Sequence, residues 1–294
     1  MSTRPRRLKP ARRCPSPRHQ GGVALAIVVW FIAGMSLLVA GIVAHARVDT
    51  RMAQLHVAGA RAAAAGDGAI QLMMASLVTG RLEAPAPGAL PRAAFRLGEL
   101  LTEVTIVPVN GLLDINSASP PLLELLFSRV GGMDPTMAKS VADNVIKWRK
   151  PPAQRGKPGK ARRFTAVEDL LRVEGVNRAL YDDVRDYLAV GDGSRARTNW
   201  SAAPEDLVAL LREADPGRAA SVERQRGQSS AGAGAGQLSV ASGGAYRLDA
   251  VVRYGDELWL RRRWVKMEPA IGSTLPWRAS RTEAPRVIGK AIEK

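Results

Sequence analysis

One long apolar run dominates the N-terminal part of the chain. From Val23 to Ala44 no side chain carries a charge, and Ser36 is the only polar one. The run has 22 residues, and about 20 apolar residues are enough for a helix to cross the hydrocarbon core of a membrane. The pattern therefore predicts a transmembrane helix over 23–44.

Beyond this run the pattern changes to that of an amphipathic helix. Apolar residues recur at spacings of three, four and seven at Val48, Met52, Leu55 and Ala62. Gly80 then supplies a helix stop signal. We expect one long helix over 23–80, whose outer half is packed by the domain that follows.

Three later segments alternate between apolar and polar residues, as strands do. The first segment is Thr102–Val109. The second and third are Ala245–Tyr254 and Leu258–Val265, which we expect to form a hairpin. In the last of these, alternation predicts one apolar face and one face of arginines. Isolated hairpins are marginally stable, so we assign 92–113 and 244–268 to one small antiparallel sheet packed on the long helix.

The segment 114–215, between these strands, has a helical pattern. Ser117–Pro120 and Ser201–Pro204 each precede an apolar run and combine capping residues with proline, which is typical of a helix start. The two tetrapeptides lie 84 residues apart, either as a weak internal repeat or by chance. We predict a large all-helical insertion.

Two further segments lack a periodic pattern. The segment 216–243 is rich in Gly, Ala and Ser and predicts a flexible loop. The tail 269–294 is basic, contains prolines and predicts an extended chain. The predicted fold class is α+β, with a long N-terminal transmembrane helix on a small antiparallel sheet and an all-helical insertion.

Charge predicts the orientation of the membrane helix. The chain of 294 residues carries a net charge of +16, and its leader over 1–22 has seven Lys/Arg and no acid. Positive flanks stay on the cytoplasmic side of a membrane, so we expect a cytoplasmic N-terminus and a globular region outside. Without the leader the charge is +9, which is sixteen less seven. We interpret this remaining positive charge as a solvated basic surface. Binding of a polyanion is the alternative interpretation.

Catalytic chemistry is sparse in this sequence. The one cysteine is Cys14, and the three histidines are His19, His45 and His56, all in the leader or close to the apolar run. No GxSxG, SxxK or Gly-rich phosphate-loop motif occurs. We therefore expect no enzyme activity, no catalytic residue and no metal site.

The junction between leader and apolar run has three interpretations. A cleaved secretory signal has a shorter apolar core followed by a small-residue cut site, whereas this run continues into more helix. A plain signal anchor is the second. In the third, the chain is cut before the apolar run, between Gly22 and Val23. That arrangement resembles the leaders of type IV prepilins and of the pseudopilins of type II secretion, in which a membrane peptidase cuts after a glycine and the new N-terminus is methylated. The resemblance implies methylation of Val23.

The residue at the fifth position after the expected cut differs from most of these subunits and points to one family among them. Most such subunits carry Glu as the fifth mature residue, where it pairs with the N-terminal amine of a neighbour inside the apolar filament core. A buried charge needs a partner of this kind. Counted from Val23, the fifth residue here is the non-acidic Ile27, which resembles the K family of large minor pseudopilins (general secretion pathway protein K).

Further points of resemblance follow along the chain, at Asn110–Gly111, Ile115–Pro120, Val145–Arg149, Phe164–Val176 and the final hairpin. The resemblance implies a pilin-like sheet interrupted by the helical block. It also implies a single-pass inner-membrane protein of a Gram-negative cell, with its globular region in the periplasm. Its role would be non-catalytic, at the tip of the pseudopilus, where it helps initiate assembly for protein export across the outer membrane. The implied partners are the minor pseudopilins I and J, the prepilin peptidase and the inner membrane.

Calcium is implied by the resemblance alone, since some members of the family bind it. No acidic cluster stands out as a ligand set, so we assign no ligands and expect no other cofactor. Asp182, Asp183 and Asp186 lie on a predicted helix, and we interpret them as a solvated face.

A membrane-anchored DNA-binding protein is the main alternative. Val173–Val176 followed by Ala179 resembles a helix-hairpin-helix turn, whose backbone amides can face phosphate. The basic loop over 155–163 would add charge. However, Glu174 would repel phosphate and a second glycine is missing. We therefore expect no nucleic-acid partner.

Overall fold

The computed structural model describes residues 21–82, 85, 89–150, 162–191, 198–232 and 244–291. The leader over 1–20, most of the basic loop (151–161), the segment 233–243 and the last three residues lie outside this range, so the expectations for them stay predictions. The chain forms two compact units, Met1–Val57 and Ala58–Lys294.

The fold class is α+β, as predicted. The elements, in chain order, are α1 (Gly21–Val78), β1 (Arg92–Leu97), β2 (Leu100–Pro108), η1 (Val109–Gly111), β3 (Leu113–Asp114), α2 (Pro120–Leu125), the π-helical η2 (Leu126–Val130), α3 (Pro135–Arg149), η3 (Val167–Arg172), α4 (Arg178–Val184), η4 (Arg185–Tyr187), β4 (Leu188–Ala189), η5 (Trp200–Ala202), α5 (Glu205–Ala214), α6 (Pro216–Gly232), β5 (Ala245–Tyr254), β6 (Glu257–Lys266), β7 (Arg278–Thr282) and β8 (Arg286–Lys290).

The predicted long helix is α1, a single element of 58 residues. It ends close to the predicted position because Gly80 adopts a positive φ of 65°. The N–H of Arg81 then donates to the carbonyl of Ser76 at 2.8 Å, which closes the last turn. The first unit contains α1 up to Val57, and the rest of α1 belongs to the second unit.

The sheet of the second unit has the order β1-β2-β5-β6-β7, and β8 also pairs with β6. All of these pairs are antiparallel. β2 and β5 are neighbours although the whole helical block lies between them in sequence, so the block is an insertion between two strands of one sheet. The predicted hairpin is β5–β6, with Gly255 in its turn at a φ of 58°.

Three strands of this sheet were not predicted. β1 lies in the segment assigned to the sheet, but its alanines gave no strand pattern. The basic tail was expected to be merely extended, whereas β7 and β8 pair with opposite halves of β6. These segments become strands because the free edge of β6 offers unpaired backbone groups.

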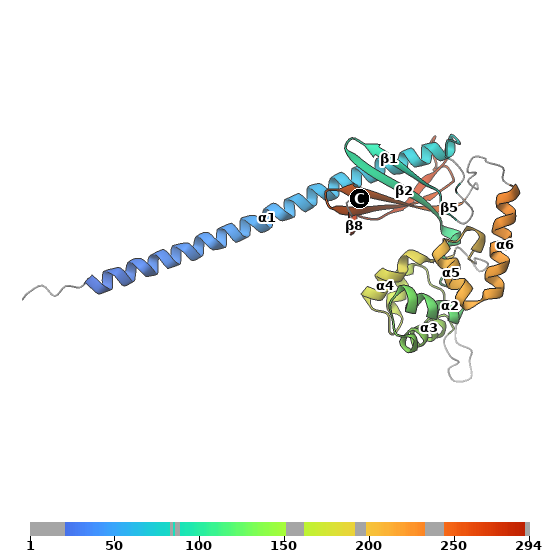
Figure 1. Cartoon of the computed structure of the whole chain (residues 1–294), viewed down its shortest axis with the longest axis horizontal. Helices are drawn as coiled ribbons and strands as arrows, with labels where there is room; N and C mark the ends of the chain where they lie inside the picture. The colour runs from blue at the N-terminus through green and yellow to red at the C-terminus, as the bar shows by residue number, and fades with distance from the viewer. Residues whose placement is uncertain are drawn as a thin grey trace, which may run out of the picture. The chain divides into compact units, whose positions relative to one another are not determined.

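The C-terminal part of α1 packs on one face of the sheet (Figure 1). Near its end, large side chains of α1 meet apolar residues of the strands, among them Ile70, Met73, Leu77, Val104, Ile106 and Leu248. Nearer Ala58, small residues of α1 make the apolar contact with the sheet, where Ala58, Ala62 and Ala65 cover Trp259. Small residues here let the helix approach the indole ring closely.

Gly66 allows a close approach between α1 and β6. A Cβ built at Gly66 would lie 2.5 Å from Arg261 Cβ, whereas one at Gly59 would lie 3.5 Å from the Trp259 ring. We expect Gly66→Ala to lower the free energy of unfolding by about 1–3 kcal/mol through overpacking. The matched Gly59→Ala variant should leave it unchanged or raise it by up to about 1 kcal/mol, because alanine favours helix. Urea unfolding of the full chain in detergent, followed by tryptophan fluorescence, measures both; equal losses would contradict this packing.

The prediction of one apolar and one arginine face for β6 is wrong. Arg261 and Arg263 lie on the face toward α1, where both contact Asp67, at 2.8 and 2.9 Å. Arg262 lies on the opposite face and contacts Asp186 and Asp249. Alternation correctly placed Arg262 on the face opposite to Arg261 and Arg263. It did not show that each face also carries a carboxylate that pairs with these arginines.

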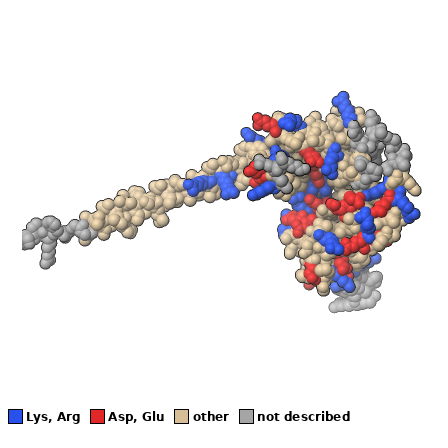
Figure 2. Space-filling view, in the orientation of Figure 1, with Lys and Arg blue, Asp and Glu red and all other residues tan. Residues whose placement is uncertain are grey.

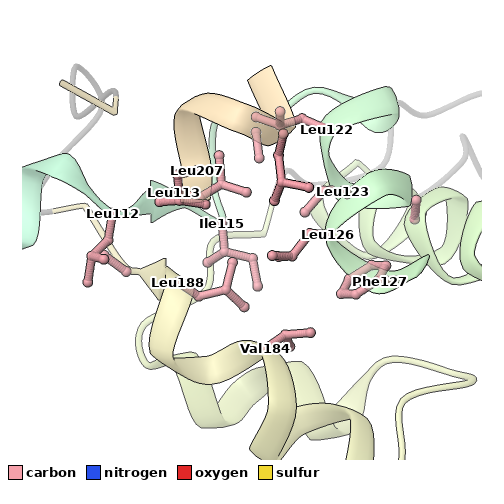
Figure 3. Close-up of a cluster of buried hydrophobic side chains, with 14 of the residues drawn as sticks. Leu112, Leu113, Ile115, Leu122, Leu123, Leu126, Phe127, Val184, Leu188 and Leu207 are labelled. Carbon is pink, nitrogen blue, oxygen red and sulfur yellow. The ribbon is translucent and has the colours of Figure 1, made fainter. Parts of the chain in front are cut away.

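The helical block encloses its own apolar core (Figure 3). Side chains from β3, α2, η2, α4, β4 and α5 converge there, including Leu113, Ile115, Leu123, Phe127, Val184, Leu188 and Leu207. The prediction of an all-helical insertion is wrong in one detail, because the short parallel pair β3–β4 joins the start of the block to the segment after η4. The N–H of Ile115 extends this pairing by donating to the carbonyl of Ala189 at 3.0 Å. The expected serine caps are not formed: Ser119 makes no side-chain cap bond, and α5 begins after Pro204.

Two helical hairpins of the block pack on each other through their turns. The first joins η2 to α3 through Gly132, and the second joins η3 to α4 through Gly175, both with positive φ (63° and 89°). A Cβ built at Gly131 of the first turn would lie 2.3 Å from Leu180 of α4, and one at Gly175 of the second turn would lie 2.8 Å from Val141 of α3. This exchange fixes α3 against α4.

The prediction of a flexible loop over 216–243 is wrong for its first part, which is α6. Asp215 accepts a hydrogen bond from the N–H of Arg218 at 3.0 Å, and Pro216 stands at the first position of the helix. Ala219 and Val222 are buried in the core of the block. Composition suggested a linker, but these two side chains supply the tertiary packing that stabilises a helix. Residues 233–243 lie outside the described part of the chain.

Candidate functional site

The N-terminal part of α1 is an apolar rod without protein cover. Every residue from Val23 to Val57 is exposed in the chain as described. Figure 2 shows no charged atom on the visible face of this helix between the grey leader and its first arginines. An apolar surface of this size on a folded chain marks a membrane or protein interaction site.

α1 is the one helix, among the described residues, that is long and apolar enough to cross a membrane. Its most apolar window has a mean hydropathy of 2.6, and no part of that window is buried. The core helix of a soluble protein would be mostly covered by its own chain. The sequence-based prediction of a membrane-spanning helix is therefore supported by length, composition and exposure.

The predicted processing site lies at the start of this helix. α1 begins at Gly21, so Gly22 and Val23 fall in its first turn. Ile27 lies about one turn further along, with 62% of its surface exposed. Cleavage and methylation at this junction stay predictions, and so does the significance of a non-acidic residue at position 27.

A second feature is the Asp186 cluster, which we define as Asp186, Arg247, Asp249, Arg262 and Arg286. Arg262 contacts the Asp186 carboxylate with two nitrogens, and its Nε donates to Asp249 Oδ1 at 2.6 Å. Arg286 donates to the Asp186 carboxylate at 3.2 Å, and Arg247 donates to the Asp186 carbonyl at 2.6 Å. One residue of η4 thus binds three strands of the sheet.

The charges of the Asp186 cluster stabilise one another. Burial by itself would raise the pKa of Asp186, but hydrogen bonds from Arg262 and the surrounding arginine charges hold it below its usual value. Burial opposes the charge of Arg262, yet its bonds to Asp186 and Asp249 raise its pKa. Burial lowers the pKa of Arg247, whose charge Asp249 favours. The Asp186 carboxylate and the Arg262 guanidinium thus favour each other's charged form, and the cluster acts as a structural link.

Beside the cluster lies a cleft of about 420 Å³ between sheet and helical block. Apolar residues such as Val109 and Leu112 line one part of it, and charged or aromatic ones line the rest, including Arg185, Trp264 and Arg281. Arg281 crosses it, stacking over Trp264 at 4.8 Å and donating to Glu168 at 2.6 Å.

The acidic residues near α4 differ in their surroundings. Asp182 and Asp183 are exposed, as predicted for a solvated face. For Asp186 that prediction is wrong, because 29% of its side chain is exposed and three arginines surround it. Among the residues described here, no group of three or more His, Cys, Asp and Glu side chains is placed to hold a metal ion.

The turn that resembles a helix-hairpin-helix motif is held by its own chain. Asn177 accepts from the N–H of Leu180 at 2.8 Å, so it caps α4 in the place of the expected second glycine. The Glu174 carbonyl accepts from Asn144 at 3.1 Å, and Arg178 pairs with Asp182 at 2.8 Å. The exposed Glu174 side chain leaves the turn poorly suited to phosphate.

This geometry predicts that the turn does not bind DNA. We expect the full chain in detergent not to retard a DNA duplex at low salt, because the one arginine that opens α4 is neutralised by Asp182. A gel-shift titration over salt concentration measures this. A salt-sensitive shift that Arg178→Ala abolishes would contradict the prediction and restore the DNA-binding hypothesis.

Three tryptophans of the second unit make structural contacts. Trp148 stacks on Phe164 with ring centroids 4.0 Å apart. Trp259 is buried under the small residues of α1. Trp264 lies under Arg262 and Arg281.

Comparison with solved structures finds a chain of the crystal structure of the GspK-GspI-GspJ complex from the enterotoxigenic Escherichia coli type 2 secretion system. The two sequences are 13% identical, the match covers 83% of this chain and 99% of that chain, and the TM-score is 0.43. No protein-family model matches the sequence. No curated protein matches it either.

Sequence reasoning missed the Asp186 cluster. Asp249 and Arg262 face each other across β5 and β6, so the hairpin register alone would have paired them. Asp186 gives no such signal, because it lies 76 residues before Arg262 and joins it only when η4 docks on the sheet.

Proposed function

We propose that this protein is a minor pseudopilin of type II secretion, of the K type, and that it has no catalytic role. In this proposal α1 anchors the chain in the inner membrane, with the leader in the cytoplasm and the globular unit in the periplasm. The prepilin peptidase removes the leader between Gly22 and Val23 and methylates Val23. The subunit then helps to initiate the pseudopilus together with minor pseudopilins I and J.

The single observation that carries the proposal is the division of α1. Its part up to Val57 is wholly exposed and apolar over 23–44, while its part from Ala58 is packed on an antiparallel sheet. A helix of this kind can exchange lipid for neighbouring helices without any change in the globular unit. That exchange is what a filament subunit stored in a membrane requires.

Two features support a place at the tip. The helical block is inserted between β2 and β5 and adds bulk to the sheet, which a subunit with nothing stacked above it can accommodate. Ile27 stands where most subunits of such filaments carry an acid, so this chain offers no carboxylate to a neighbour's N-terminal amine. A buried carboxylate without its partner would be costly, and a tip subunit has fewer neighbours to supply one.

The proposal is tested by secretion and by partner capture. We expect deletion of the gene in its native host to leave type II exoproteins in the periplasm, and the full chain to restore their export. We expect the tagged full chain, extracted in detergent, to co-purify with minor pseudopilins I and J of the same system. An unrelated tagged single-pass protein is the control. Normal export after deletion, together with no capture of I and J, would contradict the proposal.

A further inference from the structure

Sheet and helical block meet at two places of different chemistry. At the first, Val107 of β2 is buried in the core of the block, with Leu90 and Val109 packed beside it. At the second, the contact is ionic: the Asp186 cluster and the Arg281–Glu168 pair at 2.6 Å. The apolar contact adjoins the point where the chain passes from β2 into the block.

The cleft of about 420 Å³ separates these two contacts. Its lining includes Val109 and Leu112 from the apolar contact, and Asp186 and Arg262 from the ionic one. Atoms that face an open cleft make fewer dispersion contacts than packed atoms. Beyond the apolar contact, among the residues described, the block is therefore held to the sheet across this cleft largely by charged side chains.

One carboxylate dominates the ionic contact. Asp186 receives Arg262 from β6 and Arg286 from β8 on its side chain, and Arg247 from β5 on its carbonyl. Asp249 lies in the sheet and accepts from two of these arginines, from Nε of Arg247 at 3.1 Å and from Nε of Arg262 at 2.6 Å. If Asp186 withdraws, Arg247 and Arg262 therefore keep an anionic partner. Arg247 and Arg262 can therefore keep their positions in the sheet when the helical block moves away from it.

From this geometry we propose that the helical block is a hinged module. The apolar contact around Val107 is the hinge, and Asp186 is an ionic latch that selects a closed orientation. Opening the latch separates η3 and η4 from β6, β7 and β8 and widens the cleft, which exposes more of the half-buried Trp264. The inference concerns the globular unit alone and does not depend on the proposed function.

Spin labels on either side of the cleft test the hinge. Thr282 of β7 and Arg172 of η3 are both exposed, and each is replaced by cysteine in the full chain with Cys14→Ser. Double electron–electron resonance in detergent then measures the distance between the labels. We expect one narrow distribution for this parent and an added population at longer distance for Asp186→Asn, which removes the charge but keeps an acceptor. Asp183→Asn, at an exposed acid of α4, is the matched control and should leave the distribution unchanged.

A second variant keeps the test decisive. Arg286→Gln removes only a partner whose side chain is 36% exposed, so it should fold whether or not Asp186→Asn does. We expect it to add a smaller population at longer distance, with helix content by circular dichroism unchanged. The proposal is overturned if Arg286→Gln keeps the parent distribution while Asp186→Asn either does the same or unfolds. It is also overturned if Asp183→Asn opens the cleft as much as Asp186→Asn.

Discussion

Replacing Arg262 with alanine is expected to lower the free energy of unfolding of the globular unit by about 3 kcal/mol or more. Only 4% of the Arg262 side chain is exposed, and it bonds Asp186 and Asp249 together. Its removal takes the shared arginine away from two largely buried carboxylates, and breaking a buried ion pair from one side costs about 3–5 kcal/mol. Urea unfolding of the full chain in detergent, followed by tryptophan fluorescence, measures the loss.

Arg263→Ala is the matched control, because it removes the neighbouring arginine on the other face of β6. Asp67, the partner of Arg263, keeps two bonds from Arg261 at 2.8 and 3.0 Å. We expect a loss within about 1 kcal/mol, as for a partly exposed ion pair. If Arg263→Ala costs as much as Arg262→Ala, the Asp186 cluster has no special place in the stability of this unit.

Replacing Gly22 with valine is expected to leave the leader attached and to abolish export. In the proposed function, a membrane peptidase cuts after Gly22, in the first turn of α1. A β-branched side chain there is stiff and adds bulk directly beside the bond to be cut. The uncut subunit keeps seven cationic residues in front of its apolar rod. Those charges cannot enter an apolar filament core. Immunoblotting for the size of the chain and an exoprotein secretion assay measure both effects.

Gly21→Val is the control for this prediction, since it adds the same side chain one residue earlier. It should be processed and should support export. Normal export by an uncut Gly22→Val protein would show that removal of the leader is unnecessary.

The sequence predicted those elements whose signals are local. The membrane helix follows from the composition of 23–44 alone. The hairpin β5–β6 follows from alternation on either side of Gly255 and Asp256, although β6 begins one residue earlier than predicted, at Glu257. Both patterns report on residues a few positions apart. This is why the α+β class, the long helix and the antiparallel hairpin could be predicted from the sequence.

Elements that depend on distant partners were missed. α6 is helical because Ala219 and Val222 reach the core of the block, although its composition is that of a linker. β8 carries two exposed apolar residues, Val287 and Ile288, and becomes a strand only by pairing with β6. In the sequence, Asp186 has the pattern of an exposed acid on a helix surface. Its buried contacts form only because η4 packs on the sheet. In each case tertiary contact overrides the local pattern.

The N-terminal residue and mass of the mature protein test the central claim most directly. The protein is purified from membranes of its native host and analysed by intact-mass spectrometry and N-terminal sequencing. We expect a chain that begins at Val23 and carries one methyl group on its amine. A chain that still begins at Met1, or one that begins beyond Ala44, would contradict it.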